Sequence, residues 1–68
     1  MVEIQIKDDF IKLGQAMKLA GASDTGADAK DDIISGKVKV NGEEETRRGR
    51  KLYKGDVFEF EGNRYSIK

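Results

Sequence analysis

The sequence contains no cysteine and no histidine among its 68 residues. Disulfide bonds are therefore excluded, and so is a zinc site of the usual kind, because that ion is held by thiolates and imidazoles. The same absences remove the commonest catalytic nucleophiles and general bases. Ser23, Ser35 and Ser66 have no evident base partner at helical or strand spacing. We therefore expect a protein that is not an enzyme, with no catalytic residues, metal or cofactor.

Long apolar segments are also absent. No run approaches the roughly 20 apolar residues that a membrane-spanning helix needs, and the chain does not open on a basic segment followed by an apolar one. A chain this short forms one domain, residues 1–68, and buries only about 60% of its unfolded surface. We expect a single cytoplasmic domain that is monomeric and has no membrane partner.

What the sequence does contain is charge, and it is distributed unevenly. The 13 basic and 13 acidic residues cancel. Residues 21–45 hold three lysines against seven carboxylates, a net charge of −4, whereas residues 46–68 hold seven basic against three acidic side chains, a net charge of +4. The positive charge is densest in Arg47-Arg48-Gly49-Arg50-Lys51. The distribution of charge matters more than its sum for the choice of partner.

The first part of the chain predicts a strand and a helix. Residues 2–6 alternate between apolar and polar, as expected for a strand with one buried face. Asp8 and Asp9 are suitable N-cap residues, and apolar side chains then recur at helical spacing over residues 10–20. Gly14 lies inside this segment, where glycine costs about 1 kcal/mol relative to alanine. We expect another backbone to pack closely against it.

A second helix and several strands follow. Thr25 and Asp28 have capping-box spacing for a helix that continues to about Ser35, and Asn41-Gly42 is a strong hairpin signal. Leu52 is the one clear apolar anchor of residues 47–54. The fold class is therefore α+β, with two N-terminal helices packed on a small antiparallel sheet of four to five short strands. Besides the first strand, these are expected near residues 37–40, 43–46, 57–60 and 65–67.

The segment Arg47–Lys51 is the strongest candidate for a binding site. Its glycine lets the backbone bend, and an arginine side chain presents a planar fork that matches phosphate oxygens and stacks on exposed bases. Two other interpretations stay open: the segment offsets the carboxylates of Glu43–Glu45, or it docks an acidic protein partner. Lys37 and Lys39 alternate with apolar residues on one strand, so they either extend the basic segment or cover the wet face of a sheet. Tyr53 and Tyr65 either stack bases or pack in the core.

Several motifs together resemble a known family. They are Leu13–Gly21, Thr25-Gly26-x-x-Ala29-Lys30, Gly36-Lys37-Val38-Lys39-Val40-Asn41-Gly42, and Glu43-x-Glu45-Thr46-Arg47-Arg48-Gly49-Arg50-Lys51-Leu52 followed by Gly55-Asp56. In this order they resemble the RNA-binding domain named after small-subunit ribosomal protein four, the S-four domain. The extension from Glu43 to Asp56 resembles one branch of that family, the small stand-alone bacterial proteins of the YaaA/YbcJ type.

The resemblance implies an αL-type fold, in which two helices and a small antiparallel sheet flank a basic groove. It also implies binding of structured RNA without catalysis, where the RNA is ribosomal RNA, free or in a ribosomal particle or ribosome-assembly intermediate. Asn41, Gly42, Gly55 and Asp56 would be structural. The RNA-facing candidates carried over by position are Lys18, Thr25, Lys30, Lys37, Lys39, Arg47, Arg48, Arg50 and Lys51.

Two departures from the family pattern concern the second helix. Many relatives have an arginine near its start, where this chain has Gly26 and Ala27. The helix is also unusually acidic, and carboxylates facing RNA would repel it, so we expect the contacts to shift towards residues 47–51. The rival interpretation of function is a protein-interaction module whose basic loop docks an acidic partner.

Overall fold

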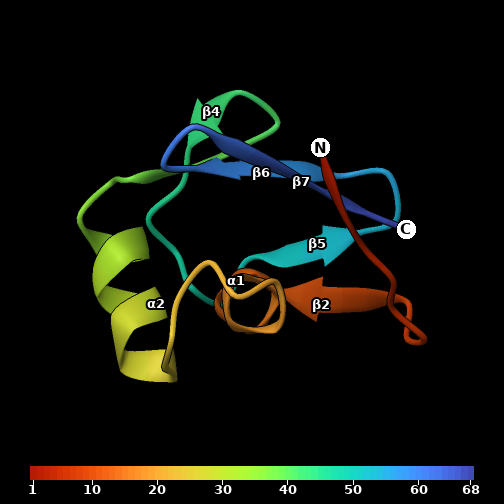
Figure 1. The fold of residues 1–68 in the computed structure, drawn as a ribbon, viewed down its shortest axis with the longest axis horizontal. Coiled ribbons are helices and arrows are strands. Elements are labelled where there is room, and N and C mark those ends of the chain that lie inside the picture. The colour runs from red at the N-terminus through yellow and green to blue at the C-terminus, as the bar shows by residue number, and fades with distance from the viewer.

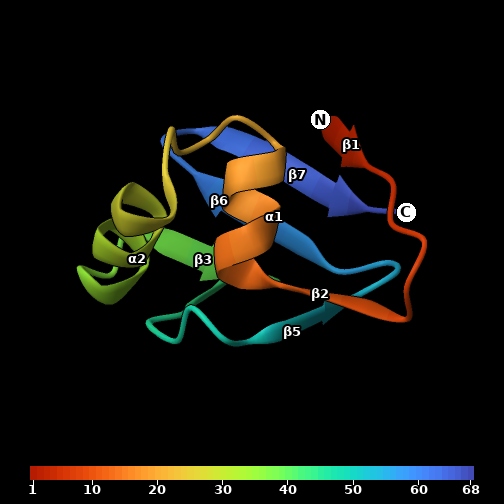
Figure 2. The ribbon, with the colours of Figure 1, turned by 90° about the horizontal axis from the view of Figure 1, so that it is seen from below.

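A five-stranded sheet forms the larger layer of the protein in the computed structural model, which describes residues 1–68. Its strand order is β1-β7-β6-β3-β4. The outer strand β1 pairs in parallel with β7, and every other pairing is antiparallel. The two termini lie near each other on one side of the molecule (Figures 1 and 2). The bounds are β1 (Val2–Ile4), β3 (Val38–Val40), β4 (Glu43–Glu44), β6 (Val57–Phe60) and β7 (Asn63–Ile67).

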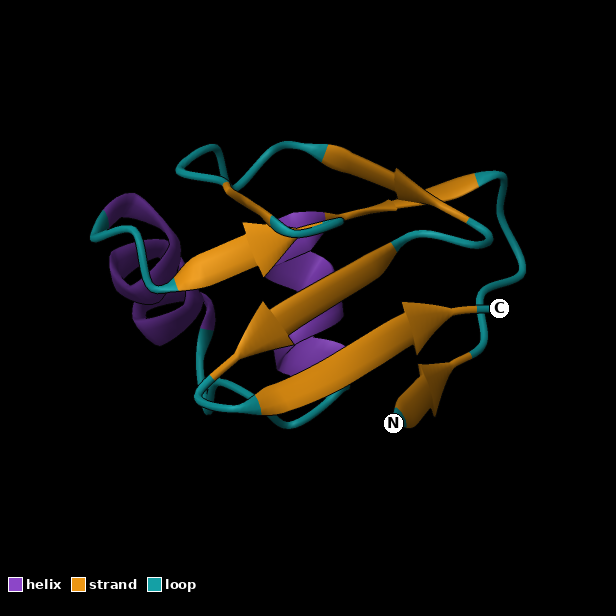
Figure 3. Cartoon of the chain, turned by 90° about the horizontal axis from the view of Figure 1, so that it is seen from above, coloured by secondary structure: helices purple, strands orange, loops and turns teal.

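A two-stranded ribbon and two helices complete the fold. The ribbon pairs β2 (Phe10–Lys12) with β5 (Lys51–Tyr53) in antiparallel register. The helices α1 (Leu13–Leu19) and α2 (Gly26–Ile34) lie on one side of the large sheet, where α1 crosses its face and α2 lies at one end. The other face of the sheet is uncovered (Figure 3). The α+β class is confirmed, but the single antiparallel sheet is not, because the main sheet is mixed and a second sheet stands beside it.

The first helix begins later than its apolar spacing predicts. Residues 10–12 form the strand β2, and Asp8 and Asp9 cap nothing; the N-cap position is Lys12, which makes no side-chain capping bond. The first N–H groups of α1 are satisfied from elsewhere: Leu13 N–H donates to the Arg50 carbonyl (2.8 Å) and Gly14 N–H to the Arg48 carbonyl (3.0 Å). Backbone from the loop before β5 therefore caps this helix in place of a side chain.

The second helix follows its sequence signals. Thr25 is the N-cap, and its hydroxyl oxygen accepts a hydrogen bond from Asp28 N–H at 3.1 Å. Ala29 and Ile33 face inward and are buried. Gly36, with a φ of 80°, follows the C-cap Ser35 in the left-handed conformation that ends many helices.

Asn41 and Gly42 form the predicted hairpin turn, both with positive φ (51° and 86°). The Asn41 side chain also ties this turn to the next one, because its Oδ1 accepts from Val57 N–H (3.0 Å) and its Nδ2 donates to Asp56 Oδ1 (3.2 Å). These contacts make Asn41 and Asp56 structural residues. The last hairpin, between β6 and β7, turns at Glu61-Gly62, both with positive φ.

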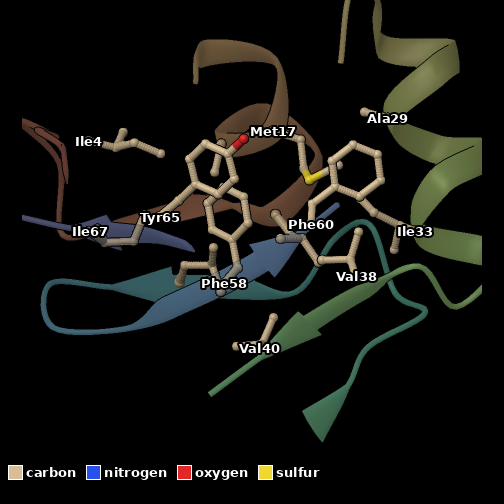
Figure 4. Close-up of a cluster of buried hydrophobic side chains, with 13 residues drawn as sticks. Ile4, Met17, Ala29, Ile33, Val38, Val40, Phe58, Phe60, Tyr65 and Ile67 are labelled. Atoms are coloured by element: carbon tan, nitrogen blue, oxygen red, sulfur yellow. The ribbon is translucent and has the colours of Figure 1, made fainter. Parts of the chain in front are cut away.

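The core lies between the helices, the ribbon and the inner face of the large sheet (Figure 4). Phe58 and Tyr65 stack at its centre with ring centroids 4.7 Å apart, so packing is the role of Tyr65. Leu52 is fully buried, as predicted for the anchor of its segment. Burial of a side chain such as Leu52 or Phe58 stabilises the fold by about 1.5–3 kcal/mol. Because the ribbon shares this core, its outer face is held at a fixed place beside α1.

Candidate nucleic-acid interface

A buried carboxylate organises the basic loop, which we define as residues 45–50. Glu45 is only 6% exposed and accepts five hydrogen bonds within the loop. Two come from the backbone N–H groups of Thr46 and Arg47, two from the Arg47 guanidinium (both 3.0 Å) and one from Arg50 Nη1 (2.8 Å). The bonds from Arg47, followed by the bond from Arg50, lower the pKa of Glu45 from 4.5 to about 2.

The loop arginines consequently differ in what they have available for a ligand. The Arg47 side chain is 73% exposed but has one edge of its fork on Glu45, and Arg50 is 32% exposed and ion-paired to the same carboxylate. Arg48 makes no ion pair and is exposed. The interpretation that the segment offsets the carboxylates of Glu43–Glu45 therefore holds for Arg47 and Arg50 against Glu45 alone. The Arg48 guanidinium has no ion-pair partner within the chain.

The free Arg48 lies against the first turn of α1. Its carbonyl accepts from Gly14 N–H, and a Cβ added at Gly14 would lie 3.7 Å from the Arg48 Cβ. Another backbone thus packs at Gly14 as expected, although a Cβ there would meet only ordinary van der Waals distances. The Cβ of Arg48 therefore lies next to the first turn of α1.

These elements enclose a small cleft of about 340 Å³, which we call the cationic cleft. Three of its residues are cations, and neither a carboxylate nor an apolar side chain lines it. The first two N–H groups of α2, at Gly26 and Ala27, have no hydrogen-bond partner within the chain, and Gly26 lies on the cleft. The N-terminus of a helix adds to a positive potential. The lining residues are Lys12, Gly14, Gln15, Lys18, Gly26, Arg48 and Gly49.

The structure brings part of the implied RNA-facing set together here. Lys18 and Arg48 line the cleft directly. Arg47 and Arg50 belong to the same loop as Arg48, and Lys51 follows it on β5, opposite Lys12 in the ribbon. These residues therefore lie on neighbouring elements, namely the loop, the ribbon and α1.

Lys37 and Lys39 lie elsewhere and do not extend this region. Val38 and Val40 point into the core, so Lys39 points to the uncovered face of the large sheet, where its cross-strand neighbours are Glu44 and Glu59. Both lysines line a separate cleft, together with Glu59 and Glu61. Two carboxylates therefore share that cleft with the two cations.

The carboxylates of the second helix do not line the cationic cleft. They line another cleft of about 350 Å³ together with Glu61, whereas Gly26 at the start of the helix faces the cations. The implied candidates Thr25 and Lys30 are exposed but line neither cleft, and Thr25 is the helix cap. The acidic cleft contains Asp24, Asp28, Asp31 and Asp32.

Two features of the site are not evident from the sequence. Lys12 is one of the three cations of the cleft. It lies on β2, within residues 10–20 for which the apolar spacing predicts a helix, and the resemblance does not include it among the RNA-facing residues. Glu45 looks like one more acid in Glu43-Glu44-Glu45, and its burial depends on the loop folding back over it. The only sequence signal is its spacing, two residues before Arg47 and five before Arg50.

Comparison with known proteins identifies the class. The chain matches the family model described as "S4 domain" over residues 4–68 and belongs to that family, the S-four family of the resemblance above. It is 49% identical over 59 residues to the Bacillus subtilis protein named "Probable ribosome maturation protein RlbA", covering 87% of this chain and 83% of that one. It is 38% identical over 61 residues to the Escherichia coli protein named "Putative RNA-binding protein YbcJ", covering 90% of this chain and 87% of that one. Neither helix of the fold has the length and apolar character needed to cross a membrane.

Proposed function

We propose that this chain binds structured RNA without transforming it, and that the cationic cleft receives the phosphate backbone. Membership of the S4 domain family and the relative named for RNA binding support the class of ligand. The relative named for ribosome maturation supports ribosomal RNA, free or in an assembly intermediate, as the target. The lack of histidine and cysteine supports a binding role rather than a catalytic one.

The observation that carries the proposal is the local charge of the cleft. In a protein with no net charge, three cations converge on one concave surface that no carboxylate lines. Such a surface binds polyanions because each phosphate that it neutralises releases condensed counterions. Three phosphate contacts give a slope of log affinity against log salt of roughly −2 to −3. The expected affinity is therefore modest and strongly dependent on salt.

The geometry of the cleft suits duplex RNA recognised by its backbone. The major groove of an RNA helix is too narrow for side chains to read, so proteins recognise the duplex by shape, phosphates and 2′-hydroxyls. A cleft lined by cations, three glycines and one amide offers donors to such groups and no apolar surface for bases. Arg48 contributes a planar fork for phosphate oxygens, and Lys12 and Lys18 contribute point charges.

The test compares two variants with the same change in charge. One neutralises the cations of the cleft with Lys12→Gln, Lys18→Gln and Arg48→Gln. The other neutralises three exposed lysines outside it with Lys30→Gln, Lys37→Gln and Lys39→Gln. Binding of a ribosomal RNA hairpin is measured by fluorescence anisotropy between about 50 and 200 mM salt, a range over which phosphate contacts weaken strongly.

We expect the cleft variant to lose at least about tenfold in affinity at low salt and to have a shallower salt slope. The matched variant outside the cleft should stay within about threefold of the wild type. Equal losses in both variants would mean that net charge, rather than the cleft, determines binding. If the wild-type protein binds no folded RNA and instead captures an acidic protein, the rival interpretation is correct.

A further inference from the structure

The ribbon formed by β2 and β5 has an outer face with a distinctive composition. Phe10 pairs with Tyr53, Ile11 with Leu52, and Lys12 with Lys51. Leu52 is fully buried and Ile11 packs against the core, so the alternate residues point outward. Two aromatic side chains and two lysines therefore share one surface, which we call the ribbon face: Phe10, Lys12, Lys51 and Tyr53.

The contacts on the ribbon face leave one aromatic ring open. The Phe10 and Tyr53 rings have centroids 6.0 Å apart and are inclined at 52°. Lys51 Nζ lies 4.7 Å from the Phe10 centroid and occupies that ring with a cation. Tyr53 is 50% exposed, and its hydroxyl has no hydrogen-bond partner within the chain. Tyr53 is therefore half exposed to solvent, with no hydrogen bond within the chain for its hydroxyl group.

We propose that Tyr53 stacks an unpaired nucleobase of the RNA that the cationic cleft binds, an inference that rests on the proposed function. An aromatic ring beside positively charged side chains is how proteins bind single-stranded nucleic acid, because every base has a π-face and every linkage carries a phosphate. Lys51 is fixed over Phe10 and lies next to the open ring, where it can pair with a phosphate of the same nucleotide. The ribbon face thus contacts a single-stranded segment that leaves the structured part of the RNA.

Continuity with the cationic cleft supports this occupant. Lys12 belongs to both surfaces, since it lines the cleft and is the cross-strand partner of Lys51. Neither lysine is ion-paired within the chain. The acids next to the ribbon lie at its other end, where Asp9 precedes Phe10 and the Asp56 carboxylate is engaged by Asn41 and by Tyr53 N–H (2.7 Å). The positive end of the ribbon face is therefore the end that meets the cleft.

The test uses short RNA hairpins with the same stem. One is blunt, others carry an adenosine tail at the 5′ or the 3′ end, and matched versions carry an abasic tail of equal length. The wild-type protein should bind at least one adenosine-tailed hairpin about fivefold or more tightly than its abasic counterpart, the effect of one stacked base. The Tyr53 ring protons should also shift upfield in the NMR spectrum of that complex.

Two variants separate stacking from packing. Tyr53→Phe keeps the ring and should keep the preference for the adenosine tail. Tyr53→Leu keeps an apolar side chain of similar reach and should lose the preference while binding the blunt hairpin like the wild type. If the wild type binds the blunt hairpin but does not distinguish base from abasic tails, the stacking proposal is wrong and the proposed function stands. If it binds no hairpin at all, the proposed function itself fails.

Discussion

The carboxylate of Glu45 accepts a 2.8 Å hydrogen bond from Arg50 Nη1, and this contact ties the end of the β3–β4 hairpin to the start of β5. With the two bonds from the Arg47 guanidinium, it folds the basic loop into a fixed shape. The Arg50 carbonyl then caps Leu13 and the Arg48 carbonyl caps Gly14. One buried acid thereby determines where the free arginine of the loop lies.

Replacement of this acid should destabilise the protein. Glu45→Gln puts an amide donor among groups that are themselves donors, so at least one hydrogen bond from Arg47 or Arg50 is lost. Because the Arg47 side chain is 73% exposed and solvent screens its charge, we expect a loss of about 1–2 kcal/mol in the free energy of unfolding. Urea titration measures it. The exposed and unpaired Glu43 provides the control, since Glu43→Gln should change stability by less than about 0.5 kcal/mol. Equal effects of the two substitutions would contradict this role for Glu45.

The same carboxylate should make stability depend on acid pH. The folded state holds the pKa of Glu45 at about 2 against an ordinary value of 4.5, so the folded state binds fewer protons at this group than the unfolded state does. Its contribution is therefore complete above pH 4.5 and is lost as the pH falls from 4.5 to about 2. The stability of the wild type, measured by thermal unfolding across this range, should converge on that of Glu45→Gln. A difference between the two that is constant down to pH 2 would show that ionisation of Glu45 is irrelevant.

Substitution of Gly14 should change the stability of the fold and its affinity for RNA in opposite directions. Its backbone is helical, and an added Cβ would meet the Arg48 carbonyl oxygen at 3.6 Å without a clash. Gly14→Ala should therefore stabilise the fold by about 0.5–1 kcal/mol through helix propensity. The methyl group would also project at the lining of the cationic cleft, so RNA affinity should fall while stability rises. A destabilised variant would mean that the approach of Arg48 leaves no room for a side chain.

The turn residue Asn41 combines a backbone and a side-chain role. Asn41→Gly keeps the left-handed conformation at φ 51° and loses the bonds to Asp56 and Val57, so a loss of about 1 kcal/mol is expected. Asn41→Ala loses the same bonds and adds backbone strain, for a total of about 2 kcal/mol. Chemical denaturation of both variants separates the two terms. If alanine and glycine cost the same, positive φ is not a source of strain in this turn.

Local signals predicted the parts of the fold that depend on neighbours in sequence. Thr25 caps α2 through Asp28 N–H three residues on, and Asn41-Gly42 turns the hairpin. The start of α1 was wrong because Phe10 has helical spacing to Leu13 and yet pairs with Tyr53, far along the chain. The parallel pairing of β1 with β7 is likewise a contact between the two ends of the chain, for which no local pattern exists.

The candidate site was predictable in composition but only partly in geometry. The density of arginine in residues 47–50 indicated the loop whose Arg48 lines the cationic cleft. Its division into a free Arg48 and a paired Arg47 and Arg50 depends on the burial of Glu45, which is a tertiary property. The strand alternation of Lys37 and Lys39 was correct, but the face of the sheet on which they lie follows from where the helices pack.

The most direct test of the central claim is an amide NMR titration of the wild-type protein with a structured ribosomal RNA hairpin at low and at moderate salt. We predict salt-sensitive shifts concentrated at the cationic cleft, in Gly14, Gln15, Lys18, Gly26 and Arg48, and little change around Lys37, Lys39 and residues 59–62. Shifts centred on the uncovered face of the sheet, or no shifts with several unrelated RNA folds even at low salt, would contradict the claim that this cleft binds RNA.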